Sequence, residues 1–161
     1  LNAYPRSDGF SILPTLLHPK SRGTVSLFSA DPKAAPIIQP NFLEEKEDLA
    51  QLVKGGKIVF DIMEQEGLKK HTKENGLPHN RTDDSLLIEH IKKTLETVYH
   101  PVGTCKMGND AMAVVDSNLT VHGIKNIRVV DASIMPKIVS GNTNAPVYMI
   151  AEKAAEMILN C

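Results

Sequence analysis

The pattern of the sequence changes at about residue 98, and this change constrains the fold more than any other feature. Before it, apolar residues recur at helical spacing, at Leu49, Leu52, Val53, Gly56, Val59, Phe60 and Met63. After it, the periodicity stops, and glycine, proline and asparagine are frequent among short apolar runs. Because a 3.6-residue period indicates a helix packed on a core and dense Gly and Pro indicate turns, we expect two parts of different architecture.

The first part, residues 1–97, predicts helices together with an antiparallel pair of strands. The periodic stretch predicts a helix that follows an acidic start and ends at Gly67, and a second helix is expected from Asp83 onwards. Residues 10–17 and 24–29 each predict a strand, and we expect them to pair across a short loop. The predicted fold class is therefore α+β.

The second part, residues 98–161, predicts short strands and one helix. Val114-Val115 and Leu119–Val121 are short strand candidates, and Ile127–Val130 has the apolar character of a buried strand in a parallel sheet. Ala145–Asn160 predicts a final helix, because its apolar residues line one side and a proline occupies the first turn.

Composition excludes several classes of protein. Of the 161 residues, 42% are hydrophobic and 23% are charged, which is typical of a globular chain and not of a disordered one. The 18 Lys and Arg residues nearly balance the 19 Asp and Glu residues, so no charge pattern favours nucleic acid or an acidic membrane. No apolar run approaches the roughly 20 residues that span a bilayer. The chain starts without Met or a signal pattern, so we expect it to belong to a longer protein. The sequence does not predict the cellular compartment of that protein.

The best candidate for proton transfer is His100, in the segment Tyr99–Thr104. A following proline and a nearby glycine favour a defined, non-helical backbone there, and imidazole titrates near neutral pH. A structural loop histidine is the alternative. Cys105 suggests a Cys/His nucleophile, but a buried small side chain is the simpler interpretation. The sequence also leaves open whether Cys105 forms a disulfide with Cys161. The six histidines and two cysteines show no paired metal-ligand spacing, so no metal site is predicted.

Two further segments are candidates for ligand binding. Residues 140–146, Ser-Gly-Asn-Thr-Asn-Ala-Pro, precede the last helix, where backbone N–H groups can bind an electron-rich group. The alternative is that Thr143 or Asn144 only caps the helix. Asp131 ends the predicted buried strand, where it could contact a ligand or cap the following turn.

Taken together, these segments resemble the C-terminal part of the glucose–methanol–choline (GMC) oxidoreductases. The resemblance is carried in order by Tyr99-His100-Pro101-Val102-Gly103-Thr104-Cys105-Lys106-Met107-Gly108, Val114-Val115-Asp116, Val121-His122-Gly123-Ile124, Ile127 to Pro136, and Ser140 to Pro146 with its helix. Ser21-Arg22-Gly23, Asp31-Pro32 and Pro40 to Leu43 are similar to the family's substrate domain. The resemblance therefore covers nearly the whole chain.

The resemblance implies oxidation of an alcohol, with hydride passing to N5 of FAD and a histidine taking the hydroxyl proton. It places the base at His100 and a substrate-orienting amide at Asn142. It also implies FAD contacts at Asp131 and Ala132, near the ribityl–phosphate chain, and at Thr143 and Asn144, beside the pyrimidine edge of the flavin. Main-chain N–H groups at a helix start suit the reduced flavin, because they stabilise negative charge.

The glycine-rich dinucleotide fingerprint of the family is absent from this sequence. The resemblance therefore implies a C-terminal fragment: residues 1–97 from the substrate-binding domain, and 98–161 carrying the catalytic motif and the return strand and helix of a Rossmann-like FAD domain. We expect this piece alone to bind FAD weakly or not at all.

Within the family, the sequence looks most like the insect-type glucose dehydrogenases, which implies a sugar hydroxyl as substrate and a quinone-type electron acceptor. Analogy with those enzymes also suggests secretion. The alternatives are an FAD alcohol oxidase that uses oxygen and a catalytically silent homologue that works by binding. A zinc or cysteine hydrolase is a more distant alternative.

Overall fold

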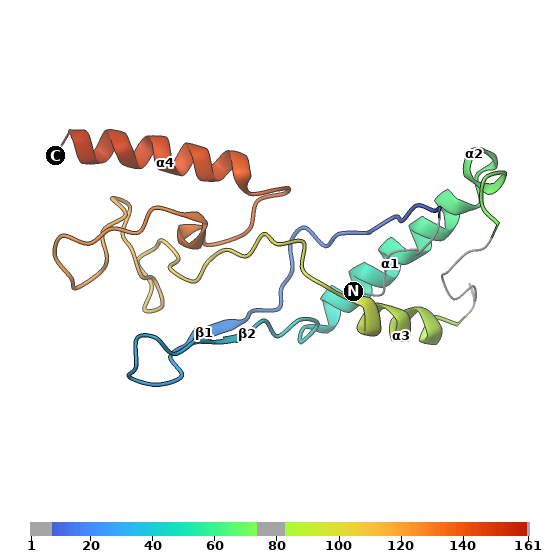
Figure 1. The fold of residues 1–161 in the computed structure, drawn as a ribbon, viewed down its shortest axis with the longest axis horizontal. Coiled ribbons are helices and arrows are strands. Elements are labelled where there is room, and N and C mark those ends of the chain that lie inside the picture. The colour runs from blue at the N-terminus through green and yellow to red at the C-terminus, as the bar shows by residue number, and fades with distance from the viewer. Residues whose placement is uncertain (1–7, 74–82, 161) are drawn as a thin grey trace. The chain divides into compact units, whose positions relative to one another are not determined.

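The computed structural model describes residues 8–73 and 83–160. Figure 1 labels the helices and strands in chain order. The chain divides into two compact units. Within the described residues, unit 1 comprises 8–22, 41–73 and 83–98, and unit 2 comprises 23–40 and 99–160.

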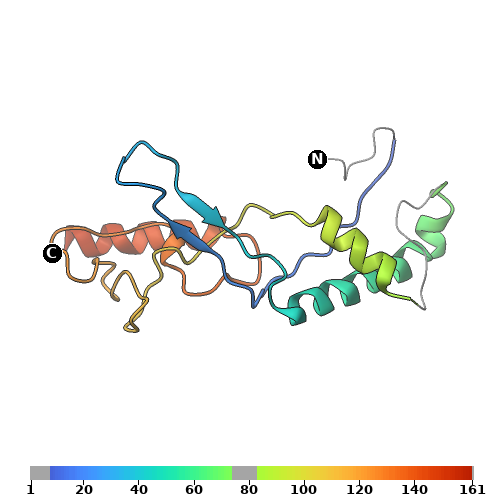
Figure 2. The same ribbon diagram turned by 90° about the horizontal axis from the view of Figure 1, so that it is seen from below.

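Unit 1 is built on helices whose apolar faces meet. Helix α1 spans Lys46–Met63, α2 spans Glu66–Lys69 and α3 spans Ser85–Thr94. The predicted stripe of α1 is confirmed, because Leu52, Val53, Gly56, Val59 and Phe60 are buried. Its core joins Val53 and Phe60 to Leu87 of α3, and Figure 2 shows the two helices side by side. The predicted end at Gly67 is wrong, since α1 ends at Met63 and Gly67 lies in the separate short helix α2.

A glycine on α1 allows the two helices to approach closely. A Cβ atom built on Gly56 would lie 3.0 Å from both terminal methyl carbons of Leu87. This distance is tighter than ordinary van der Waals contact, so the bare glycine backbone provides the space that Leu87 fills.

The predicted strand over residues 10–17 is wrong, since this segment has no regular structure. Instead, the segment that follows it is tied to α1. The buried carboxylate of Asp48 accepts hydrogen bonds from the backbone N–H groups of Lys20 and Ser21, each at 2.8 Å. Pro14 lies where a Cβ on Gly55 would be. Residues 8–22 are thus held by side-chain acceptors and packing, not by a β ladder.

The electrostatics of Asp48 follow from these contacts. Burial alone would raise the pKa of Asp48, but hydrogen bonds from the Lys20 backbone and from the Ser21 side chain and backbone, with the charge of Arg22, lower it below its ordinary value. The folded state therefore favours the carboxylate over the protonated acid.

The Asp48→Asn variant is expected to reduce stability at neutral pH by about 1.5–3 kcal/mol, because a neutral amide replaces a charged acceptor of two N–H groups. The contribution of Asp48 is present above the carboxyl pKa of the unfolded chain and is lost as pH falls through the lowered folded value. Urea denaturation from about pH 6 to about pH 3 should therefore show the free energies of unfolding of the two proteins converging towards acid pH.

A matched control is Glu89→Gln, which removes an exposed carboxylate of α3. Its free energy of unfolding should stay parallel to that of the unchanged protein across this pH range. A constant gap between Asp48→Asn and the unchanged protein down to acid pH would contradict the assignment.

Unit 2 begins with a short hairpin. Strands β1, Thr24–Ser26, and β2, Ile37–Gln39, pair antiparallel with Val25 opposite Ile38. The pair is the one marked by arrows in Figure 2. The expected antiparallel pair therefore exists, but its second strand is Ile37–Gln39 and not residues 10–17. A Cβ on Gly23 would run into the carbonyl oxygen of Gln39, so the position directly before β1 requires glycine.

The rest of unit 2 packs irregular chain against one helix. Residues 99–131 contain only the isolated bridges Met107–Val115, Val115–Val121 and Thr120–Arg128. The strands predicted over Val114-Val115, Leu119–Val121 and Ile127–Val130 are therefore present only as one or two bridge residues each. The short 3-10 helix η1 spans Ala132–Ile134 and helix α4 spans Asn144–Leu159, as predicted to within one residue at each end.

The core of unit 2 is formed by four buried residues that come from the irregular chain, η1 and α4: Val115, Leu119, Ile134 and Ala154. Together with the small sheet and the helices of unit 1, this packing agrees with the predicted α+β class.

Candidate active site

The backbone around His100 is held in an unusual conformation. Tyr99, directly before it, has φ +64°, and Gly103, directly after Pro101-Val102, has φ +93°. A left-handed conformation is strained for tyrosine, and such strain persists only where the surroundings enforce it. Here the N–H of Cys105 donates to the carbonyl of Ser133 at 3.0 Å, which ties this loop to η1.

The structure joins His100 to the start of α4. Nδ1 of His100 lies 3.0 Å from the hydroxyl of Thr143, and this hydrogen bond links residues 43 positions apart. Thr143 is buried, with 6% of its surface exposed, and His100 is half-buried. Asn142 directly precedes Thr143, so the two predicted catalytic residues, His100 and Asn142, lie on neighbouring pieces of chain.

The start of α4 offers unused hydrogen-bond donors. In the part of the chain that the structure describes, the N–H groups of Asn142, Asn144 and Ala145 make no hydrogen bond, and Pro146 has no N–H. The first intrahelical bond runs from Val147 N–H to the carbonyl of Thr143 at 3.0 Å. Asn142 and Asn144 are exposed. The segment therefore presents main-chain donors, at the positive end of a helix dipole, to an electron-rich ligand.

The side chain of Asp131 caps η1. Its carboxylate accepts from the N–H of Ser133 at 2.7 Å, and Asp131 is exposed while Ala132 is half-buried. Since η1 packs against α4, these two predicted cofactor positions and the 142–144 segment belong to one packed region of unit 2. The hydroxyl of Ser133 is buried without a partner among the described residues, and no sequence pattern indicated this.

The Thr143 hydroxyl is the contact that sequence reasoning missed. Threonine before a helix indicates a cap, and no local pattern could indicate that its hydroxyl instead faces a histidine. Cys105 is half-buried and not in a disulfide, while Cys161 and His79 lie outside the described residues. Among residues 8–73 and 83–160, no three His, Cys, Asp or Glu side chains come close enough to hold a metal ion.

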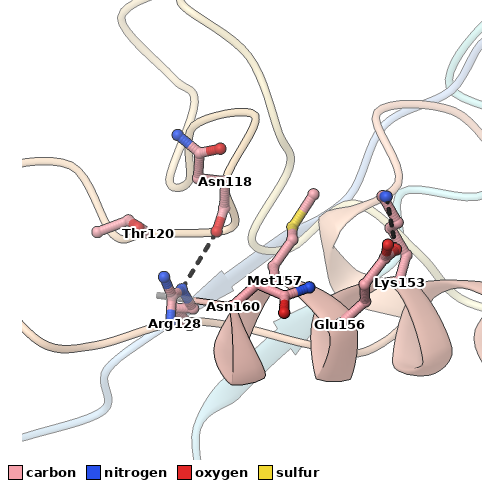
Figure 3. Close-up of a pocket in the computed structure, with 7 residues that line it drawn as sticks. All are labelled: Asn118, Thr120, Arg128, Lys153, Glu156, Met157 and Asn160. Atoms are coloured by element: carbon pink, nitrogen blue, oxygen red, sulfur yellow. Dashed lines mark hydrogen bonds and ion pairs between the residues drawn. The ribbon is translucent and has the colours of Figure 1, made fainter.

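A separate pocket of about 490 Å³ lies elsewhere in unit 2, and Figure 3 draws the residues that line it: Asn118, Thr120, Arg128, Lys153, Glu156, Met157 and Asn160. Arg128 donates from Nε to the carbonyl oxygen of Asn118 at 3.3 Å, and Lys153 pairs with Glu156 at 2.7 Å. None of the predicted site residues lines this pocket. The His100 region, where the predicted residues lie, therefore stays the candidate active site.

The fold and these motifs define a GMC oxidoreductase. The family model described as GMC oxidoreductase, in its C-terminal form, matches residues 19–151. The chain belongs to the GMC oxidoreductase family, whose members are FAD-dependent enzymes acting on CH–OH groups.

Curated relatives agree with this assignment. The chain is 50% identical to "Alcohol dehydrogenase [acceptor]" of Pseudomonas putida over 144 residues, covering 89% of this chain and 26% of the relative. It is 42% identical to "Oxygen-dependent choline dehydrogenase 1" of Chromohalobacter salexigens over 156 residues, covering 95% of this chain and 28% of the relative. The chain thus spans little more than a quarter of the length of these relatives. Both are bacterial, and the insect-type glucose dehydrogenase resemblance is not shown by them.

Solved structures share the fold. Pyridoxine 4-oxidase from Mesorbium loti superposes with a TM-score of 0.84 at 32% identity, covering 90% of this chain and 28% of that chain. A formate oxidase of Aspergillus oryzae, studied for its FAD modification, has a TM-score of 0.79 at 33% identity, covering 89% of this chain and 26% of that chain. Among the described residues, no helix has the length and apolar character needed to span a bilayer.

Proposed function

We propose that this chain is the C-terminal part of a longer FAD-dependent enzyme that oxidises an alcohol, with His100 as the base. The observation that carries the proposal is the 3.0 Å hydrogen bond between His100 and Thr143. It places the imidazole beside the helix start whose main-chain N–H groups are unused. A proton acceptor next to donors for an electron-rich ring is the arrangement that dehydrogenation of an alcohol needs.

The residues present fit a flavin. The unpaired N–H groups of Asn142, Asn144 and Ala145 suit the oxygen and nitrogen acceptors of the flavin's pyrimidine edge. We assign the main chain of Asp131 and Ala132 to the ribityl–phosphate portion, since the Asp131 carboxylate is already used as a cap. FAD, when bound, supplies an acceptor for the hydride of the carbinol carbon.

The side chains of His100 and Asn142 have different roles in this proposal. With Nδ1 of His100 engaged by Thr143, Nε2 is the nitrogen left to take the proton of the substrate hydroxyl. Asn142, which cannot titrate, orients that hydroxyl through its side-chain amide. Proton removal therefore falls to His100 alone.

We retain the proposed domain assignment, with residues 1–97 in the substrate-binding domain and 98–161 in a Rossmann-like FAD domain. Two observations bear on it. The compact units divide between Val98 and Tyr99, and the hairpin of residues 23–40 groups with the second unit. The bridge at Arg128 and helix α4 are the elements of this chain that would join such a domain.

The substrate class we propose is an alcohol, with no narrower assignment. The insect-type resemblance favours a sugar hydroxyl and a quinone-type acceptor, whereas the named relatives are an alcohol dehydrogenase and a choline dehydrogenase. We propose an organic acceptor, which the 50% identity to "Alcohol dehydrogenase [acceptor]" supports. An oxygen-using oxidase is the second candidate, favoured by the likeness to pyridoxine 4-oxidase and formate oxidase.

The test uses the full-length protein with its flavin, mixed without oxygen with glucose, a primary aliphatic alcohol, an aryl alcohol and choline in turn. At least one alcohol should bleach the oxidised flavin absorbance, and a quinone should restore it faster than oxygen does. Faster recovery with oxygen, with release of hydrogen peroxide, would instead establish the oxidase. A flavin that no alcohol reduces would leave the silent homologue as the better description.

A further inference from the structure

The threonine at the start of α4 does not cap the helix. A threonine at the N-cap normally uses its hydroxyl to accept from a backbone N–H in the first turn. Thr143 is the N-cap of α4 and makes no such bond. Its hydroxyl lies 3.0 Å from Nδ1 of His100 instead, although the nearby N–H groups of Asn144 and Ala145 have no partner among the described residues.

We propose that Thr143 is a positioning residue that fixes the tautomer of His100, accepting a hydrogen bond from Nδ1–H so that Nε2 is left unprotonated. This inference rests on the proposed function of His100 as the base. In the opposite arrangement Thr143 would donate to Nδ1, and Nε2 would carry the proton and could not accept one. Only one direction of the bond thus suits a base that works at Nε2.

The hydrogen bond between His100 and Thr143 would also be retained when Nε2 takes the proton. When Nε2 takes a proton, the imidazolium carries N–H on both ring nitrogens, and Nδ1–H continues to donate to the Thr143 hydroxyl. The hydroxyl therefore need not reorient between the two states of the ring. A preorganised site is expected to keep its hydrogen-bonding groups fixed while charge develops, and the Thr143 hydroxyl would do so as the imidazole becomes charged.

Other contacts fix the loop but not the ring. The hydrogen bonds from Cys105 N–H to Ser133 and from Met107 N–H to Ile134 anchor the backbone five and more residues beyond His100. Within the described part of the chain, the Thr143 hydroxyl is the hydrogen-bond partner of the imidazole itself. Thr143 is in turn held by burial and by the bond from Val147 N–H to its carbonyl.

The first test compares Thr143→Val with Thr143→Ser in the full-length flavoenzyme. Valine keeps the shape of the side chain and removes the hydroxyl. We expect kcat to fall by about 10- to 100-fold with KM little changed, which is the usual effect of removing a hydrogen-bond partner that orients a functional histidine. Serine retains the hydroxyl and should restore most of kcat. The matched control is Thr94→Val, which removes a half-buried hydroxyl bonded to the carbonyl of His90 in α3 and should leave kcat unchanged.

The second test needs no turnover. In the unchanged full-length protein labelled with 15N-histidine, the nitrogen shifts of His100, assigned by comparison with His100→Ala, should show Nδ1 protonated and Nε2 bare at a pH where the ring is neutral. In Thr143→Val the two tautomers should mix.

Either of two results would overturn the inference: Nδ1 bare in the unchanged protein, or a kcat of Thr143→Val equal to that of Thr143→Ser. Both are distinct from failure of the proposed function, which is reported by full turnover of His100→Ala. If Thr143→Val does not fold, the tautomer of the unchanged protein still decides the question.

Discussion

Replacing His100 by alanine in the full-length flavoenzyme is expected to lower turnover of an alcohol by about 10²–10⁴-fold, the usual contribution of a general base. The physical reason is that the neighbouring Asn142 carries only an amide, which cannot take over the proton. The flavin should stay bound, since the proposed cofactor contacts of residues 142–145 are main-chain groups. Steady-state kcat and the flavin absorbance of the purified variant measure the two effects separately.

A histidine of the same unit provides the control. His122 is exposed, and its Nε2 lies 3.0 Å from the carbonyl oxygen of Gly108. The proposed chemistry assigns it no role. His122→Ala should therefore turn over alcohol at close to the rate of the unchanged enzyme. Full turnover by His100→Ala would remove the base assignment and leave the imidazole a structural role.

The Phe60→Ala variant is expected to lower the free energy of unfolding of the protein by about 3–5 kcal/mol, because it opens a large cavity in a packed core. Phe60 is 3% exposed and packs with Val53 and Leu87 where α1 meets α3. The partly buried side chains of Leu49, Ile88 and Ile91 pack against the same cluster. Urea denaturation followed by circular dichroism measures the change.

The control for this substitution is Lys54→Ala on the exposed side of the same helix. It should change the free energy of unfolding by no more than about 0.5 kcal/mol, since it removes no buried contact and alanine favours helix. A loss of under about 1 kcal/mol in Phe60→Ala would mean that the core between α1 and α3 is not packed as described.

The helices could be predicted from sequence because their signals are local. The apolar stripe of α1, the start of α3 near Asp84 and the Pro146 in the first turn of α4 each follow from residues within a few turns. The end of α1 was the exception. Gly67 was expected to end it, but the chain leaves the helix at Met63 and forms one further turn that contains this glycine.

The strands could not be predicted equally well, because a strand depends on a partner that the local sequence does not specify. Residues 10–17 were expected to pair with the strand that starts at Thr24, yet β1 pairs with Ile37–Gln39, and the chain after residue 17 is held by Asp48 through Lys20 and Ser21. Ile127–Val130 has a strand's apolar character, but within this chain only Arg128 finds a bridge partner, Thr120.

The residues of the candidate site could be proposed from the sequence, but the contacts between them could not be predicted. The motif around His100 and the segment before α4 could be selected because both match one ordered family pattern. The bond between His100 and Thr143 could not, since nothing in either segment encodes a meeting across 43 positions. The cap formed by Asp131 was one of two alternatives that the sequence left open, and the structure contains it.

The separation of His100 and Thr143 along the chain has a consequence for biosynthesis. A ribosome delivers the imidazole first and the hydroxyl only 43 residues later. A product that stops in between would contain the imidazole without the hydroxyl that it contacts in the structure. The surroundings of this histidine are therefore complete only after a further stretch of chain has been synthesised.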